Sequence, residues 1–239
     1  PDAQESRGLG DVYKRQAVEC IHSYSLIHDD LPCMDNDTIR RGKPATHIKF
    51  GEASAVLAGS SLLTLAFEII ADKKYLLSPQ VKNEIIKSLA SCSGHTGIAG
   101  GQELDLKFEN KKKSINEIID MQKKKTGKLF NFCLHAVGAV AKKDTKEKLF
   151  LSKLGEEIGL LFQLADDLLD HNGSKKLLGK PVKKDHKKGK STLLNLMGEK
   201  KAHLFANNLK KKILRKLEKH GKNAKELIST IEFILERKF

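Results

Sequence analysis

Six aspartates fall into two short clusters that each need a compensating cation. The first cluster is Asp29, Asp30 and Asp35, and the second is Asp166, Asp167 and Asp170. Neighbouring carboxylates repel one another at neutral pH unless a positive charge lies between them. All-oxygen ligands favour a hard cation such as Mg²⁺, which completes its shell with waters and substrate phosphates. The two clusters therefore predict a site for a phosphorylated molecule held through magnesium.

The second cluster has the spacing of one helix face. Asp166 and Asp170 are four residues apart, so on a helix they lie about 40° apart, with Asp167 alongside. The other residues of segment 160–169 are mostly apolar. This context favours a functional site over an ordinary solvated acidic face.

The first cluster needs a break in its helix. On a straight helix Asp35 would point about 120° away from Asp29. Pro32 lies between them; it lacks an amide hydrogen and clashes with the carbonyl of His28. We therefore expect the helix to kink or end here and to bring Asp35 back towards the other two aspartates.

A basic loop follows the first cluster. Its sequence is Arg40-Arg41-Gly42-Lys43-Pro44. Arginine guanidinium groups suit phosphate oxygens because they bond in a planar fork. Carboxylates with a metal on one side and arginines on the other predict a diphosphate clamp.

An all-α fold must position these residues, since long segments have a 3.6-residue apolar period and no strand-like alternation is sustained. Ser78 followed by Pro79 predicts a helix N-terminus, and Gly221 predicts a C-terminal cap. Ser114 and Glu117 have the spacing of a capping box. We expect helices near residues 17–34, 51–72, 79–98, 114–141, 145–172, 191–198, 200–219 and 223–238.

A single domain is expected, because 239 residues can form one large core. Residues 1–16 show no apolar periodicity, and the helical pattern begins at Ala17. We interpret residues 1–16 as a non-native or disordered leader, unlike a signal peptide, and residues 17–239 as the domain.

Composition limits the other classes of function. The formal charge of +14 favours an anionic partner, but few aromatics and no nucleic-acid motif accompany the lysine runs, which we interpret as solvated surface. The four cysteines form no CxxC pair, which predicts a cytoplasmic location. The most apolar stretch, residues 53–71, contains three serines and a glutamate, so we interpret it as a core helix that falls short of a membrane span.

Six motifs in order resemble the polyprenyl synthase family, of the bacterial farnesyl and geranylgeranyl diphosphate synthase type. The first, from Ile21 to His47, contains the first aspartate cluster and the basic loop. The later ones are Gly100-Gly101-Gln102-x-x-Asp105, Lys125-Thr126-Gly127, Phe162-Gln163-x-x-Asp166-Asp167-x-x-Asp170, Leu178-Gly179-Lys180 and Gly189-Lys190-Ser191-Thr192. The resemblance covers Ala17 to the C-terminus and implies an isoprenoid-synthase helical bundle around a central cavity.

The resemblance also implies roles for individual residues. Magnesium, three ions per active site, would be held by Asp29, Asp35 and Asp166, supported by Asp30, Asp167 and Asp170. The allylic diphosphate would be held by Arg40, Lys125 and Lys190, with Lys180 at the leaving group. Isopentenyl diphosphate would be held by His22 and Arg41. Thr126 and Gln163 would lie beside the developing carbocation, although considered alone they favour packing or capping roles, and His22 a core position.

The implied reaction condenses isopentenyl diphosphate with dimethylallyl or geranyl diphosphate to give farnesyl diphosphate. Magnesium and cationic side chains would stabilise the departing diphosphate, the double bond of isopentenyl diphosphate would attack the allylic cation, and a proton would be lost to the released pyrophosphate. The resemblance further implies a homodimer with no nucleic-acid partner and no stable membrane insertion.

Product length is expected to depend on Tyr24, with Ser25 beside it. Tyr24 lies five residues before Asp29, a little over one helical turn from the metal site. An aromatic residue at this place resembles family members that make C15 products, and smaller residues accompany longer products. We expect Tyr24 to close the apolar tunnel beneath the first cluster.

One family element is not recognisable here. Family members carry a Gly-Lys-x-x-Arg element, which grips isopentenyl diphosphate, ahead of the first aspartate cluster, and residues 1–16 are unlike it. We therefore expect an N-terminal truncation. Alternatives are a geranylgeranyl diphosphate synthase, or an inactive fragment or non-catalytic subunit of a prenyl synthase. A terpene cyclase would not need the Arg40-Arg41 loop, and a basic nucleic-acid-binding protein would bind independently of Asp166.

Overall fold

The computed structural model describes residues 2–74, 76–172 and 192–237, and for residues 2–14 it describes the backbone alone. The predicted all-α fold is confirmed, with one short antiparallel hairpin of β1 (Ile39–Arg40) and β2 (Lys43–Pro44) in these ranges. The helices described are α1 (Asp2–Asp29), α2 (Thr46–Phe50), α3 (Glu52–Ala71), α4 (Pro79–Ser93), α5 (Ile98–Phe108), α6 (Ile115–Gln122), π-helical η1 (Lys123–Gly127), α7 (Lys128–Val140), α8 (Thr145–Asn172), α11 (Leu193–Met197), α12 (Glu199–Leu217), 3-10 helical η2 (Glu218–Ala224) and α13 (Lys225–Glu236).

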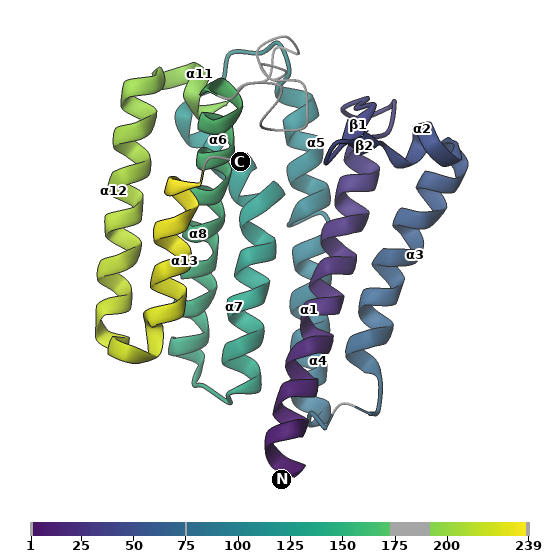
Figure 1. Cartoon of the computed structure of the whole chain (residues 1–239), viewed down its shortest axis with the longest axis vertical. Coiled ribbons are helices and arrows are strands. Elements are labelled where there is room, and N and C mark those ends of the chain that lie inside the picture. Colours follow the sequence, from purple (N-terminus) through teal and green to yellow (C-terminus); the bar gives the residue numbers. More distant parts are fainter. Residues whose placement is uncertain (1, 75, 173–191, 238–239) are drawn as a thin grey trace.

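The long helices run side by side in two groups that α7 joins (Figure 1). One apolar cluster forms among α1, α3, α4 and α7, and a second among α6, α8, α11, α12 and α13. Phe132 and Ala136 of α7 belong to the first cluster, whereas Phe130 and Leu134 pack against the second. These two pairs lie on opposite faces of α7, so this helix ties the two apolar clusters together.

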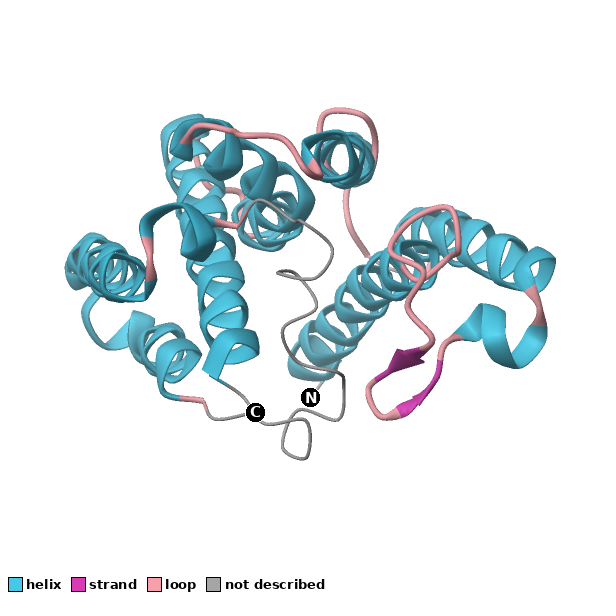
Figure 2. Cartoon of the chain, turned by 90° about the horizontal axis from the view of Figure 1, so that it is seen from above, coloured by secondary structure: helices cyan, strands magenta, loops and turns pink. Residues whose placement is uncertain are grey.

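Asp29 of the first aspartate cluster lies at the end of the bundle where α1 stops. The hairpin β1–β2 lies beside it, and α6 and α11 are at the same end of the other group (Figure 1). Figure 2 looks down from this end and shows the hairpin and α2 on the outer side of α1.

The predicted helix signals near residues 78, 114 and 221 are confirmed. Ser78 caps α4 through the amide of Val81, and Ser114 and Glu117 form a reciprocal capping box at α6. Gly221 adopts a positive φ of 52° at the kink within η2.

Three predicted helix boundaries are wrong. α1 begins at Asp2 instead of near residue 17, and it ends at Asp29 instead of near residue 34. The segment expected to be one helix over residues 79–98 ends at Ser93, and a further helix, α5, follows. A Cβ at Gly97 would lie 1.8 Å from the carbonyl oxygen of Cys92, so the tight turn between α4 and α5 requires glycine.

The prediction that residues 53–71 form a core helix holds for one face of the helix, and the prediction that they fall short of a membrane span is wrong. This segment is α3, which buries Ala55, Gly59, Ala66 and Ile70 but leaves much of its surface open. Among the residues described, it is the helix that is long and apolar enough to meet the criteria for a membrane span. Only 22% of its most apolar 18-residue stretch is buried. The exposed apolar side chains on it are Val56, Leu57 and Leu65.

Candidate active site

The chain folds back on itself after α1, as Pro32 predicts. The helix ends at Asp29, and the amide of Asp35 donates to the carbonyl oxygen of Asp29 at 2.9 Å. Asn36 takes a left-handed φ of 48° in this turn, and its amide donates to the carbonyl oxygen of Leu31 at 3.0 Å. The backbone thus returns Asp35 to the end of the helix that carries Asp29.

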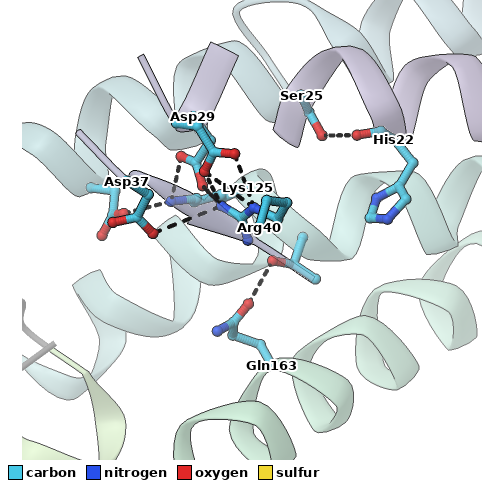
Figure 3. Close-up of polar contacts among 10 residues, drawn as sticks. His22, Ser25, Asp29, Asp37, Arg40, Lys125 and Gln163 are labelled. Carbon is cyan, nitrogen blue, oxygen red and sulfur yellow. Dashed lines mark hydrogen bonds and ion pairs between the residues drawn. The ribbon is translucent and has the colours of Figure 1, made fainter. Parts of the chain in front are cut away.

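Arg40 lies among the aspartates of the first cluster, where the sequence predicts it on the opposite side of a diphosphate. Its Nε donates to both carboxylate oxygens of Asp30 at 3.1 Å, and its Nη2 is 3.9 Å from Asp29 and 4.0 Å from Asp37 (Figure 3). Burial raises the pKa of Asp30, while the hydrogen bonds and charge of Arg40 act against that rise. The hairpin returns Arg40 to the carboxylates, which explains this placement.

Lys125 joins the first cluster to α5. Its Nζ is 2.7 Å from Oδ2 of Asp105 and 3.3 Å from Oδ1 of Asp29 (Figure 3). Asp105 belongs to a recognised motif, but the sequence assigned it no role. Its position next to Lys125 adds it to the candidate site.

The π-helical turn η1 explains how Lys125 and Thr126 face different helices. Lys125 contacts residues of α1 and α5, and the next residue, Thr126, donates from its Oγ1 to Oε1 of Gln163 on α8 at 2.9 Å. Such single π-turns inside helices often occur at functional sites. This turn was not visible in the sequence, where residues 114–141 have the pattern of one continuous helix.

Glycines let the neighbouring backbones approach η1 closely. A Cβ at Gly101 of α5 would lie 2.2 Å from the backbone nitrogen of Lys125. A Cβ at Gly159 of α8 would lie 2.6 Å from the Cα of Gly127. The first contact gives a physical reason for glycine in the Gly100-Gly101 motif, because any side chain at Gly101 would displace Lys125.

The second aspartate cluster is divided between exposed and buried positions. The side chain of Asp166 is 40% exposed, and its Oδ1 accepts from Arg237 at 2.5 Å. Asp167 and Asp170 are buried. Oδ1 of Asp167 accepts from the amide of Gln163 at 2.9 Å. The sequence did not identify Arg237, which comes from the end of the chain.

A second buried amide also holds Asp167. Nε2 of Gln122, the last residue of α6, donates to Oδ2 of Asp167 at 3.2 Å. Figure 3 shows Gln163 pointing from α8 towards the cluster of Asp29, Arg40 and Lys125. Since Lys125 and Thr126 are consecutive, one turn of backbone connects the first aspartate cluster to the second.

His22 and Arg41, which are predicted to bind the same substrate, contact each other. Nη2 of Arg41 lies 3.2 Å from Nε2 of His22, and because arginine only donates, His22 accepts. Burial lowers the pKa of His22. The charge of Glu19 raises this pKa, and the charges of Arg41 and Arg40 lower it further. His22 is therefore neutral at pH 7.

Tyr24 lies under the first cluster in the apolar interior. It is 6% exposed, and its hydroxyl donates to the carbonyl oxygen of Ser93 at 3.2 Å. Burial raises the pKa of Tyr24 to about 12, so the hydroxyl keeps its proton. Ser25 donates instead within its own helix, to the carbonyl oxygen of His22 at 2.8 Å (Figure 3).

Two predicted site residues, Lys180 and Lys190, fall in segment 173–191 and lie outside the described residues. Among the residues that are described, no three His, Cys, Asp or Glu side chains converge closely enough to hold a metal on their own. Mg²⁺ usually binds one or two protein carboxylates and takes its other ligands from waters and substrate phosphates. The carboxylate donors of α1 and α8 provide the hard oxygen ligands that it prefers.

Comparison with known proteins agrees with this geometry. The family model described as polyprenyl synthetase matches residues 12–231. The farnesyl diphosphate synthase of Escherichia coli is 41% identical over 227 residues, which cover 92% of this chain and 76% of that protein. The solved structure of an FPP/GFPP synthase from Zymomonas mobilis has a TM-score of 0.84 and 40% identity, covering 94% of this chain and 76% of that one.

A second solved structure includes ligands. It is a geranyltransferase from Helicobacter pylori complexed with magnesium and isoprenyl diphosphate, with a TM-score of 0.83 and 33% identity, covering 94% of this chain and 73% of that one. The resemblance that the six motifs indicate is therefore confirmed at the level of sequence and of structure. The chain belongs to the polyprenyl synthetase family.

Proposed function

We propose that the chain is a prenyltransferase that condenses isopentenyl diphosphate with dimethylallyl or geranyl diphosphate and gives farnesyl diphosphate. The observation that carries this proposal is the meeting of both aspartate-rich helices at η1, where Lys125 faces Asp29 and Thr126 faces Gln163. A cation for the departing diphosphate and neutral oxygens for a carbocation are thus adjacent. This is the pair of features that ionisation of an allylic diphosphate needs.

Asp29, Asp35 and Asp166 would hold Mg²⁺, with Asp30 and Asp170 as supporting carboxylates. Asp167, which the sequence analysis adds as a supporting ligand, accepts from the side-chain amides of Gln122 and Gln163. The bound Mg²⁺ supplies positive charge to the departing diphosphate. The prediction of three Mg²⁺ ions per active site stays a prediction. The magnesium in the Helicobacter pylori relative and the oxygen donors of this chain support the choice of metal.

Cationic side chains would hold the diphosphates. Lys125 and Arg40 would turn from their aspartate partners to the allylic diphosphate, because charge-assisted bonds to phosphate oxygens replace those to carboxylate. His22 and Arg41 would bind isopentenyl diphosphate, with the neutral imidazole accepting from Arg41 and so aiming its guanidinium. Lys180 and Lys190 keep their predicted roles at the allylic diphosphate.

The test is to incubate the chain with Mg²⁺, labelled isopentenyl diphosphate and either dimethylallyl or geranyl diphosphate, and to size the products. We expect a C15 product. A C20 main product would instead assign a geranylgeranyl diphosphate synthase. A folded chain that makes no product would contradict the proposal.

Replacing Tyr24 with alanine is expected to lengthen the product, because the ring fills apolar space five residues below Asp29. The ring stacks edge-on with His28 at 5.6 Å between centroids, and the hydroxyl is held by Ser93, so the side chain has one fixed place. We expect C20 or longer chains from Tyr24→Ala by mass spectrometry. Tyr24→Phe, which keeps the ring, should keep the C15 product. An unchanged product from Tyr24→Ala would refute the role of this ring.

We further propose that α3 forms the interface of a homodimer in the cytoplasm. Its exposed apolar side chains continue onto α2, where Ile48 and Phe50 are 53% and 61% exposed. Contiguous exposed apolar surface of this kind marks an interaction site. The four cysteines are all free thiols, which supports a reducing compartment.

Leu57→Glu is expected to separate the dimer, because Leu57 is 67% exposed on the open face of α3 and a charge there would be desolvated in the interface. We expect the dimer dissociation constant to rise by about 30-fold or more in light-scattering measurements. Leu204→Glu on α12, where the leucine is 62% exposed, is the matched control and should stay dimeric. A dimeric Leu57→Glu would exclude this face as the interface.

A further inference from the structure

We propose that Gln122 is a positioning residue for the reaction: through Asp167 it fixes the direction in which Gln163 and Thr126 present their oxygen atoms. The inference rests on the proposed function. It adds a buried residue that lies outside the recognised motifs and acts through other side chains. It also gives Asp167 a role different from that of a metal ligand.

The hydrogen bonds around Asp167 have a definite direction. The carboxylate accepts from Nε2 of Gln122 at 3.2 Å on Oδ2 and from Nε2 of Gln163 at 2.9 Å on Oδ1. An ionised carboxylate is only an acceptor, so both glutamines must turn their NH₂ groups towards it. This requirement leaves the carbonyl oxygen of Gln163 facing away from Asp167.

The freed carbonyl oxygen sets the hydroxyl of Thr126. Oγ1 of Thr126 donates to Oε1 of Gln163 at 2.9 Å. A hydroxyl has one proton and two lone pairs, so Thr126 directs its proton to Gln163 and keeps its lone pairs for other directions. Hydrogen bonds in a chain polarise one another, and this chain begins at a carboxylate. Negative charge is therefore shifted towards the oxygen of Thr126, which suits it to face a developing carbocation.

The burial of Gln122 indicates that its amide donor is what the site requires. Gln122 is 4% exposed, and its Oε1 has no hydrogen-bond partner among the described residues. A buried polar atom without a partner costs free energy, so packing alone would favour an apolar side chain of the same length. Gln122 also directly precedes η1, and the turn that carries Lys125 and Thr126 starts from its position.

Gln122→Met tests the proposal because methionine keeps the length and removes the donor. We expect kcat to fall about tenfold while KM for each diphosphate changes less than about twofold. The melting temperature should not fall. The matched control is Asn131→Leu, which removes another amide-to-carboxylate bond to α8, from Asn131 to Glu156 at 2.9 Å, and should keep the parent kcat.

A double variant separates positioning from general damage. If Gln122 acts through Thr126, then Gln122→Met should lower kcat no further in a Thr126→Val background. Losses that multiply would overturn the proposal, and so would a parent kcat in Gln122→Met. A chain without any activity would instead count against the proposed function.

A measurement without turnover keeps the two proposals distinguishable. The side-chain amide signals of Gln163 in NMR spectra, assigned by their loss in Gln163→Met, should shift and exchange faster with solvent in Gln122→Met. Signals at the parent positions would overturn the positioning role even if the chain made no product.

Discussion

Replacing Lys125 with methionine is expected to lower kcat by about two to three orders of magnitude, the cost of removing a preorganised charge from a developing negative charge. Lys125 touches both the first aspartate cluster, at Asp29, and the buried Asp105 of α5. In the proposed reaction the same ammonium group holds the departing diphosphate. Initial rates at saturating substrate measure the effect.

Lys128→Met is the matched control for this prediction. Lys128 lies three residues later, and its Nζ is 2.6 Å from Glu156 of α8, away from the aspartate clusters. We expect it to retain kcat within about twofold, since a partly exposed ion pair contributes little. Equal losses in both variants would show that a charge on this helix, and not the position of Lys125, matters.

Local chain chemistry was sufficient to predict the turn of the first cluster. Pro32 prevents the helix from continuing, and the return of Asp35 to Asp29 follows within a few residues. The placement of Arg40 on Asp30 was not predictable, because it depends on how the hairpin packs against α1. The sequence therefore predicted which residues come together, but it did not predict that Arg40 pairs with Asp30.

Glycine occurs both in a turn and inside a helix, and the sequence alone does not distinguish these two roles. Gly97 lies in the turn between α4 and α5, which agrees with its low helix propensity. Gly101 lies inside α5, a helix that was not predicted from the sequence. Glycine is needed at this position because a Cβ would collide with the backbone of Lys125. Close packing of backbones overrides helix propensity at that position, and with α5 the sequence reading also left Asp105 without a role.

The apolar pattern of a helix likewise does not predict which of its faces are buried within the same chain. α3 has the composition of a core helix, but it buries one face within its own chain and exposes the other. Long-range pairs were equally hidden, since Arg237 and Asp166 are 71 residues apart and no local signal links them. Such contacts follow only from the packing of α13 against α8.

Asp29→Asn is expected to lower kcat/KM by about three orders of magnitude and to raise the Mg²⁺ concentration needed for half-maximal rate. The amide keeps the shape of the side chain but loses the charge that the proposed metal requires. Removing the metal from the parent with a chelator should abolish product formation, and added Mg²⁺ should restore it. A magnesium titration of the initial rate measures both effects.

Asp72→Asn is the control, because Asp72 is partly exposed at the end of α3 and pairs with Lys74 at 2.9 Å. It should show the parent magnesium dependence. Asp29 also lies 3.3 Å from Lys125 and 3.9 Å from Arg40, so Asp29→Asn would leave both cations with less compensation and weaken the fold modestly. Rates are therefore compared at a temperature where circular dichroism shows both variants folded. Under those conditions, a parent magnesium curve for Asp29→Asn would mean that this carboxylate balances Lys125 and Arg40 without binding the metal.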